Sequence, residues 1–303
     1  MDAQLRVMPS PGPVDLARTL FPLRRGTGDP TMRIGIDQAW RATRTPDGPA
    51  TVHLQLDPST GAVLVQTWGT GAAWALDHAP GLAGLLDDDR GFEPVHEVIR
   101  QLHRRLRGVR LTRTERPMEA LIPAVMEQKV TGMEARRAYR RLSVALAEPA
   151  PGPADGLLLP PDPAAVAALP YHAFHPFGLE RRRAEVIRHL CTNATAIEAL
   201  AALPGDEARA RFTTYPGVGE WTAAEVARLA LGDADAISVG DYHLKNVVAW
   251  ALAREPRGTD ERMLELLEPY RGHRGRVQLL LEAGDIHAPK YGPRMQPAAI
   301  ERI

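Results

Sequence analysis

Residues 211–246 read RFTTYPGVGEWTAAEVARLALGDADAISVGDYHLKN. We expect a helix to end near Thr214, because a proline and two glycines follow it within five residues. Tyr215–Gly219 then predicts a tight hairpin, and Glu220–Leu231 predicts a second helix with apolar positions on one face. Short helices joined by such turns are typical of an all-α bundle.

The predicted hairpin consists of Pro216, Gly217, Val218 and Gly219. Its glycines allow a sharp turn and a close approach to a ligand. Because the turn opens a helix, unpaired N–H groups and the positive end of the helix dipole face outward, which favours a phosphate. Thr222 in the first helical turn is a candidate phosphate contact. A plain αα-hairpin without any ligand explains the same pattern.

Asp241 begins the next predicted helix, Asp241–Ala253. Aspartate is a favoured N-cap, so capping alone accounts for the residue. The same position places a carboxylate at a helix N-terminus, which favours its ionised form. Lys245 lies one turn further on, where it can pair with Asp241 or contact a phosphate.

The composition limits the class of protein. The chain has 303 residues, 44% of them hydrophobic, which is enough for one large domain or two ordinary ones. A single cysteine, Cys191, excludes an intramolecular disulfide, a cysteine zinc cage and an iron–sulfur cluster. The formal net charge is zero, which argues against a purely non-specific nucleic-acid binder but permits a local basic face. The chain has no apolar run long enough to span a membrane, so we expect a protein of the cytoplasm.

The sequence changes character near residue 103. Before it, residues 39–45, 52–56 and 62–68 alternate like strands, with turn residues at 45–49 and 58–61. Residues 72–86 and 94–106 predict helices, so 1–103 predicts an α+β domain with a small antiparallel sheet. Residues 104–303 predict a helical domain. Its predicted helices cover 118–128, 131–147, 163–169, 180–193, 194–202, 206–214, 220–231, 241–253 and 260–267. A proline-rich linker is expected at 148–161.

Three segments in order give the chain a family resemblance. Pro216–Ala223, followed by Val239–Lys245, resembles the signature of the helix-hairpin-helix DNA glycosylases, and most of all the bacterial inducible 3-methyladenine DNA glycosylases. Residues 120–131, ALIPAVMEQKVT, resemble the helix and loop with which that family probes duplex DNA. Phe177–Leu179 with Arg182–Glu185 resembles a third family segment. The resemblance spans roughly 115–250.

The resemblance implies roles for individual residues. Asp241 matches the catalytic aspartate, Trp221 and Tyr242 match aromatic residues near the base pocket, and the hairpin matches the turn that grips DNA. Gln128 and Lys129 match the loop that fills the gap left in the duplex, although the subgroup usually has an apolar wedge where this chain has Lys129. The resemblance also implies that residues 1–103 resemble half of a TATA-binding protein.

The resemblance further implies the cofactors. Carbonyls of the hairpin often hold a monovalent cation in this family, and no catalytic metal is expected. Bifunctional relatives form a Schiff base through a lysine two residues after the second hairpin glycine, where this chain has Trp221. The only lysines are Lys129, Lys245 and Lys290, so a monofunctional enzyme is expected.

The function that the resemblance implies is removal of alkylated purines from double-stranded DNA, by a monomer associated with the nucleoid. The enzyme would flip the base out, and Asp241 would stabilise positive charge on the sugar. Electron-poor bases would stack on Trp221 and Tyr242, although core packing also explains these aromatics. The alternative is a non-catalytic protein that binds damaged or abasic DNA, which would not need Asp241. A relative in fold alone, with a protein partner, is the third interpretation.

Overall fold

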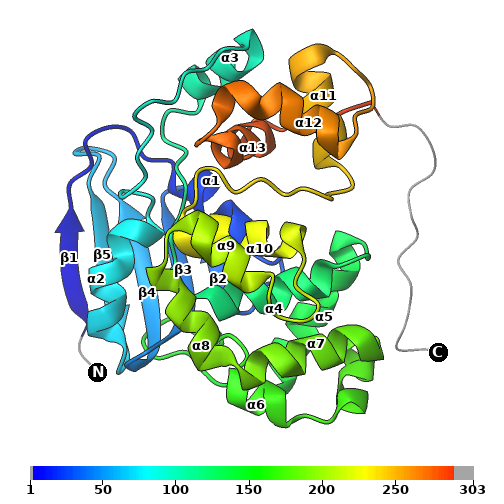
Figure 1. The fold of residues 1–303 in the computed structure, drawn as a ribbon. Helices are drawn as coiled ribbons and strands as arrows, with labels where there is room; N and C mark the ends of the chain where they lie inside the picture. Colours follow the sequence, from blue (N-terminus) through cyan, green and yellow to red (C-terminus); the bar gives the residue numbers. More distant parts are fainter. Residues whose placement is uncertain (1–2, 290–303) are drawn as a thin grey trace.

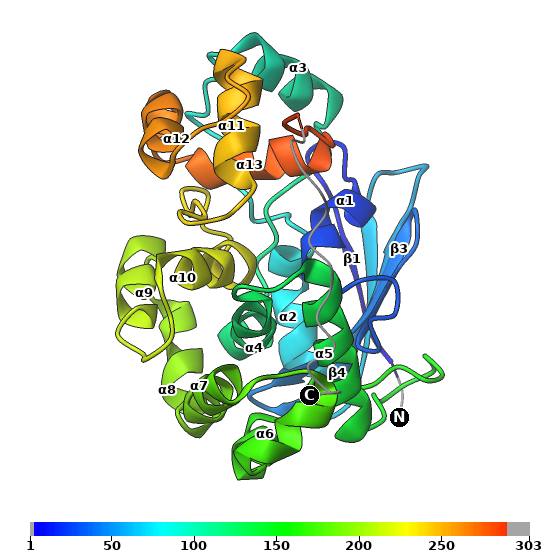
Figure 2. The same ribbon diagram turned by 90° about the vertical axis from the view of Figure 1, so that its right-hand side faces the viewer.

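The computed structural model describes residues 3–289 and contains a sheet at one side and helices around it (Figures 1 and 2). The sheet has five antiparallel strands in the order β1-β5-β4-β3-β2. Its strands are β1 (Gln4–Met8), β2 (Met32–Ile34), β3 (Gln38–Thr45), β4 (Gly48–Leu56) and β5 (Val63–Trp68). A mixed α+β protein with an antiparallel sheet is therefore confirmed, while β1 and β2 were not predicted.

The turns between the central strands explain the register of the sheet. Thr45 pairs with Gly48 across the first turn, and Gly48 has a φ of +115°, which favours glycine. In the second turn the Asp57 carboxylate accepts hydrogen bonds from Ser59 and Thr60. Both turns lie where the sequence predicted them.

The helices follow the predicted order. They are α1 (Leu16–Leu20), α2 (Ala72–Leu82), α3 (Glu97–Arg105), α4 (Pro117–Glu127), α5 (Gly132–Ala145), α6 (Pro163–Ala168), α7 (Arg181–Thr192), α8 (Ala194–Ala199), α9 (Gly205–Phe212), α10 (Glu220–Val226), α11 (Leu244–Ala253), α12 (Asp260–Leu267) and α13 (Arg274–Ala283). The capping box of α5 is confirmed, because Thr131 and Glu134 exchange side-chain and backbone hydrogen bonds. Helices α1 and α13 were not predicted. Among the helices of residues 3–289, none is long and apolar enough to cross a membrane.

The three largest clusters of buried side chains among the described residues stabilise the fold. The sheet core lies between the strands and α1 and α2, and the helical core lies among α4, α5, α7 and α10. The C-terminal core joins α3 to α11, α12 and α13, which lie together at the top of Figure 1. The division into 1–103 and 104–303 stays a prediction; its boundary falls inside α3, and residues 290–303 lie outside the described part of the chain.

The expected linker at 148–161 is packed against the sheet. Leu157 and Leu159 are buried with Ala42 of β3, and Pro149 forms a bridge with Leu158. This segment therefore covers part of the sheet face opposite α2. Cys191 is buried in the helical core, and burial raises the pKa of its thiol to about 12.

The chain passes from the helical core to the C-terminal core through residues 232–243, which we call the crossing segment. It runs between α10 below and α11 above in Figure 1. Two ion pairs anchor its first half: Asp233 pairs with Arg209 of α9, and Asp235 pairs with Arg274 of α13. Asp241 lies near the end of this segment.

Candidate active site and nucleic-acid interface

The predicted hairpin has the geometry of a compact turn between α9 and α10. The N–H of Val218 donates to the Tyr215 carbonyl at 3.0 Å, and Gly217 has a φ of +86°. Val218 is buried, whereas Pro216, Gly217 and Gly219 are exposed. Gly219 is the N-cap of α10, so the first N–H groups of this helix have no partner within it. An anion can approach this exposed turn.

Asp241 is held by three hydrogen-bond donors. Its Oδ1 accepts from the backbone N–H groups of His243 and Leu244, both at 2.7 Å, and its Oδ2 accepts from the Trp221 indole Nε1 at 3.2 Å. The helix itself begins at Leu244, three residues later than predicted, because residues 242–243 form a turn that Asp241 caps. The carboxylate is half-buried and lies beside the first turn after the hairpin.

Trp221 and Tyr242 lie in different environments. Trp221 is half-buried, packs against the helical core and uses its indole N–H on Asp241. Tyr242 is 73% exposed, and its ring contacts only His243 among the ring contacts of the described residues. The structure thus brings Trp221 to Asp241 and leaves Tyr242 open to solvent.

The two residues of the predicted probing loop also differ. The Gln128 side-chain amide donates to the Gly217 carbonyl and to the Thr222 hydroxyl, both at 2.9 Å, so Gln128 ties this loop to the hairpin. Lys129 is exposed at the tip of the loop, with a φ of +57°. Of this pair, Lys129 is therefore exposed to solvent, whereas Gln128 is held against the hairpin.

The two side chains predicted to contact a phosphate already have partners within the protein. The side chain of Thr222 is buried, with the residue 2% exposed, and its hydroxyl is already bound by Gln128, so only its backbone N–H can face a phosphate. Lys245 pairs with Asp260 at 3.2 Å and not with Asp241. Asp260 also accepts from the N–H of Gly240, which fixes the backbone next to Asp241.

Two carbonyls of the hairpin already accept hydrogen bonds: that of Tyr215 from Val218, and that of Gly217 from Gln128. A carbonyl oxygen has two lone pairs, so each retains one for a cation. The monovalent cation that the resemblance implies therefore fits this turn and stays a prediction.

Sequence reasoning missed the residues that support the site. Arg183, which belongs to the third family segment, is 3% exposed and donates to the Met126 carbonyl near the end of α4, just before the probing loop. Glu225 lies four residues after Trp221, on the same face of α10, and binds Ser238 in the crossing segment. That i, i+4 spacing was the available signal. Predicted helix 220–231 ends as an α-helix at Val226 and continues as a π-helix, Ala227–Leu231.

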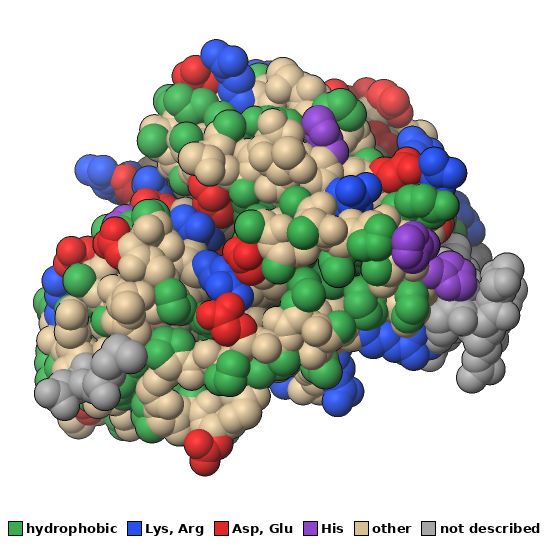
Figure 3. All heavy atoms as spheres, turned by 90° about the horizontal axis from the view of Figure 1, so that it is seen from below, with side chains coloured by type: hydrophobic (Ala, Val, Ile, Leu, Met, Phe, Trp, Pro, Cys, Tyr) green, Lys and Arg blue, Asp and Glu red, His purple; other side chains and the backbone are tan. Residues whose placement is uncertain are grey.

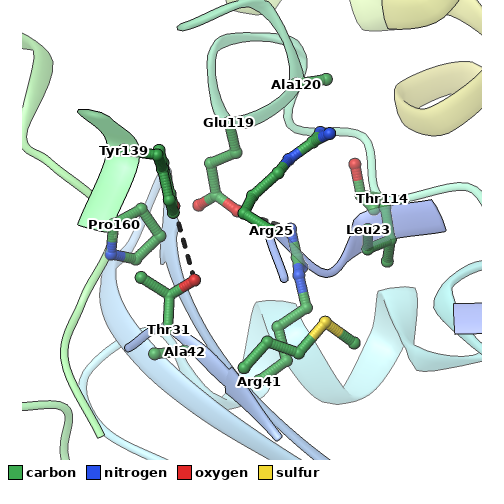
Figure 4. Close-up of a pocket in the computed structure, with 11 residues that line it drawn as sticks. Leu23, Arg25, Thr31, Arg41, Ala42, Thr114, Glu119, Ala120, Tyr139 and Pro160 are labelled. Atoms are coloured by element: carbon green, nitrogen blue, oxygen red, sulfur yellow. Dashed lines mark hydrogen bonds and ion pairs between the residues drawn. The ribbon is translucent and has the colours of Figure 1, made fainter. Parts of the chain in front are cut away.

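A small cavity lies elsewhere, between the sheet and α4. It has room for about one water molecule, about 30 Å³, and none of its lining residues is a predicted site residue. Figure 4 shows Arg25, Arg41 and Glu119 around it, with the Tyr139 hydroxyl directed at Thr31, 3.4 Å away. Glu119 joins α4 to the sheet by accepting from Arg41, Thr43 and the N–H of Arg44.

The face seen from below carries acidic and basic side chains interspersed with apolar and neutral ones (Figure 3). On that face, neither sign of charge forms a continuous area, in keeping with the zero net charge of the chain. The charge pattern of this face therefore gives no separate indication of a nucleic-acid-binding surface.

Comparison with known proteins gives matches in structure but not in sequence. No protein-family model and no curated protein matches the chain. A 3-methyladenine DNA glycosylase from Archaeoglobus fulgidus superposes with a TM-score of 0.77 at 18% identity, over 91% of this chain and 96% of that one. MBOgg1 in complex with a low-affinity DNA ligand superposes with a TM-score of 0.70 at 14% identity, over 93% and 98%.

A third similar structure is the 8-oxoguanine glycosylase/lyase of Clostridium acetobutylicum in complex with double-stranded DNA. Its TM-score is 0.62 at 13% identity, over 84% of this chain and 96% of that one. Each of these matches extends over most of this chain and nearly all of the other one. The chain therefore has the fold of the helix-hairpin-helix DNA glycosylases.

Proposed function

We propose that this protein is a monofunctional DNA glycosylase that removes alkylated purines from duplex DNA, with Asp241 as its catalytic residue. The observation that carries the proposal is the Asp241 carboxylate, fixed by three donors and joined through Trp221 to the helix that the hairpin begins. A pre-oriented charge beside a DNA-gripping turn is what cleavage of a glycosidic bond requires.

The chemistry follows from this geometry. The hairpin and the N-terminus of α10 would hold a backbone phosphate, and Lys129 would enter the space that the flipped nucleotide leaves. As the bond between base and sugar breaks, positive charge grows on the sugar, and the Asp241 carboxylate stabilises it. Water then completes the hydrolysis, and the base leaves with the bonding electrons.

Trp221 supports the monofunctional part of the proposal. Its indole occupies the position where bifunctional relatives have their lysine, and Lys245 is paired with Asp260. A Schiff base with the sugar needs an amine at this place. We also propose that Tyr242 closes on the flipped base and that the five-stranded sheet, backed by α1 and α2, corresponds to half of a TATA-binding protein.

The proposal is tested by release of free base from a panel of duplexes. The panel holds 3-methyladenine, 7-methylguanine, hypoxanthine and 8-oxoguanine, and the wild type is compared with Asp241→Asn. We expect the wild type to release the alkylated purines fastest, and the substitution to lower the single-turnover rate by roughly 100-fold or more, because the fixed charge is lost. Asp206 is an exposed acid in the first turn of α9, and Asp206→Asn is the matched control, which should keep the wild-type rate.

Two outcomes would contradict the proposal in different ways. Tight binding to damaged duplex without release of any base would favour the non-catalytic alternative. A covalent adduct trapped with borohydride on an abasic duplex would contradict the monofunctional mode alone.

A further inference from the structure

Helix α10 contacts the crossing segment at two points that are one helical turn apart. The Trp221 indole donates to Asp241, and the Glu225 carboxylate accepts from the Ser238 hydroxyl. Residues at i and i+4 lie on the same face of a helix, so both contacts come from one side of α10. The hairpin opens the same helix, which means that its position and that of the crossing segment are joined through a single rigid element.

Glu225 is fixed on its other side by buried partners. Arg228 donates to its two carboxylate oxygens at 3.3 and 3.0 Å and to Glu282 of α13 at 2.9 Å. Burial on its own would raise the pKa of Glu225, but Arg228 and the Ser238 hydroxyl outweigh that effect and keep the pKa below its usual value. The side chains of Glu225 and Arg228 are 15% and 6% exposed. Glu225 is thus an ionised acceptor with a defined orientation.

Ser238 is bound from two directions. In addition to its bond with Glu225, its N–H donates to the Gln278 side-chain oxygen at 3.3 Å, and its hydroxyl accepts from the Gln278 amide at 3.2 Å. The Ser238 carbonyl accepts from the N–H of Asp241 at 3.2 Å. Ser238 is 1% exposed, so it has no contact with bulk solvent and cannot itself touch DNA.

We infer that Glu225 is a positioning residue, which acts through Ser238 to set the place of the Asp241 carboxylate relative to the DNA-gripping hairpin. This inference rests on the proposed role of Asp241. A purely stabilising role is a weaker explanation, because a buried ion pair contributes little net stability compared with apolar residues of similar size. Through Ser238, the network joins the segment that carries Asp241 to both α10 and α13.

The first measurement reports on position without requiring activity. The Trp221 indole N–H donates to Asp241, so its ¹H–¹⁵N NMR resonance is sensitive to the place of that carboxylate. The resonance is assigned by its disappearance in Trp221→Phe. We expect Glu225→Ala to shift it in the same direction as Asp241→Asn, and Glu225→Gln, which keeps an oxygen for Ser238, to restore most of the wild-type position.

The second measurement is the single-turnover rate of base release in two backgrounds. Glu225→Ala should lower the rate roughly ten- to hundredfold in the wild type, since small misplacement of a catalytic group has effects of this size. Binding of an abasic duplex should change less than about twofold, because the hairpin is untouched. In the Asp241→Asn background the same substitution should change the residual rate less than about twofold, because the group it positions is already lost.

Glu119→Ala is the matched control. Glu119 is a similarly buried, arginine-paired carboxylate, but its contacts in the described part of the chain join α4 to the sheet and not to Asp241. It should lower stability without shifting the indole resonance. Where Glu225→Ala fails to fold, Ser238→Ala removes the same bond with a smaller loss of packing.

The outcomes separate the inference from the proposed function. If the wild type releases no base from any duplex, the proposed function is wrong. The shift of the Trp221 indole resonance then still tests the positioning role of Glu225. An unshifted indole resonance in folded Glu225→Ala and Ser238→Ala overturns the inference. An equal loss of rate in both backgrounds also overturns it.

Discussion

Lys129 has a backbone conformation that a residue with a side chain rarely adopts. Its φ of +57° lies in the left-handed region, which costs a non-glycine residue about 1 kcal/mol. The strain lies at the exposed tip of the loop between α4 and α5, while its neighbour Gln128 is tied to the hairpin. Strain of this kind is often retained where a side chain has a task. The geometry therefore separates the two residues that the sequence treated as a pair.

Lys129→Gly and Lys129→Ala distinguish strain from charge. Both remove the amine, but only glycine relieves the left-handed strain, so Lys129→Gly should unfold at higher urea concentration and gain about 1 kcal/mol over Lys129→Ala. If Lys129 meets DNA, both variants should bind duplex more weakly, with a shallower dependence on salt. Equal stability of the two variants would show that the tip is unstrained.

The hairpin contains two glycines with different requirements. Gly217 has a φ of +86°, and a Cβ added there would lie 2.5 Å from a methyl group of Val186 in α7. Gly219 has a φ of −96°, and an added Cβ would meet no atom within 4 Å. The first glycine is therefore needed by the fold, whereas the second leaves the approach to α10 open.

The matched pair Gly217→Ala and Gly219→Ala tests this difference. Gly217→Ala should lose about 1–3 kcal/mol of stability, because it adds both strain and a clash. Gly219→Ala should keep its stability within about 0.5 kcal/mol and still bind duplex less tightly, because its methyl group stands where a phosphate would approach. Chemical denaturation and a duplex-binding titration measure the two effects. Undiminished binding by Gly219→Ala would remove the hairpin from the DNA interface.

Elements with strong local signals were predictable, and those held by distant contacts were not. The glycine turn at 215–219 and the capping box at Thr131 determine their own structure from neighbouring residues. In contrast, β1 is a strand because it pairs with β5, some sixty residues away. The sequence of a five-residue segment does not contain enough information to predict so distant a partner. The role of Asp260 was not predicted for the same reason. Its contacts to Lys245 and Gly240 bring α12 to the start of α11.

The place of Asp241 beside the hairpin helix was implied by resemblance and not by spacing. What the sequence could not give was the network behind it, because Glu225, Ser238 and Gln278 come from three elements. Each is an ordinary residue in its own helix or loop, and only their convergence makes them informative. Contacts between polar groups from different elements in a core are therefore the part of a site that is hardest to predict from a single sequence.

At the scale of the whole molecule, the interface between the sheet and the helices contains a carboxyl group, that of Glu198, with a raised pKa. Burial raises the pKa of Glu198 to about 7, although Arg116 at 3.3 Å opposes this. One oxygen accepts from the Met118 N–H, while the other is buried and has no hydrogen-bond partner among residues 3–289. Glu198 therefore binds a proton more tightly in the folded protein than in the unfolded chain.

The sign of the resulting pH dependence is fixed by linkage. Between pH 4.5 and 7 the folded protein holds a proton that the unfolded chain has released, so stability contributed by Glu198 falls as the pH rises through this window. The loss should not exceed about 3 kcal/mol. Urea unfolding at several pH values should show this slope in the wild type and a flatter one in Glu198→Gln. A wild type that grows more stable relative to Glu198→Gln over this range would contradict the assignment.

The crossing segment has one end in the helical core and the other in the C-terminal core, with Asp233 held by α9 and Asp235 held by α13. A small movement of the helical core relative to the C-terminal core would displace the crossing segment before either core lost its helices. On a slow temperature ramp, base release should consequently fade while circular dichroism still reports an intact protein. On heating, the enzymatic activity should therefore be lost at a lower temperature than the secondary structure.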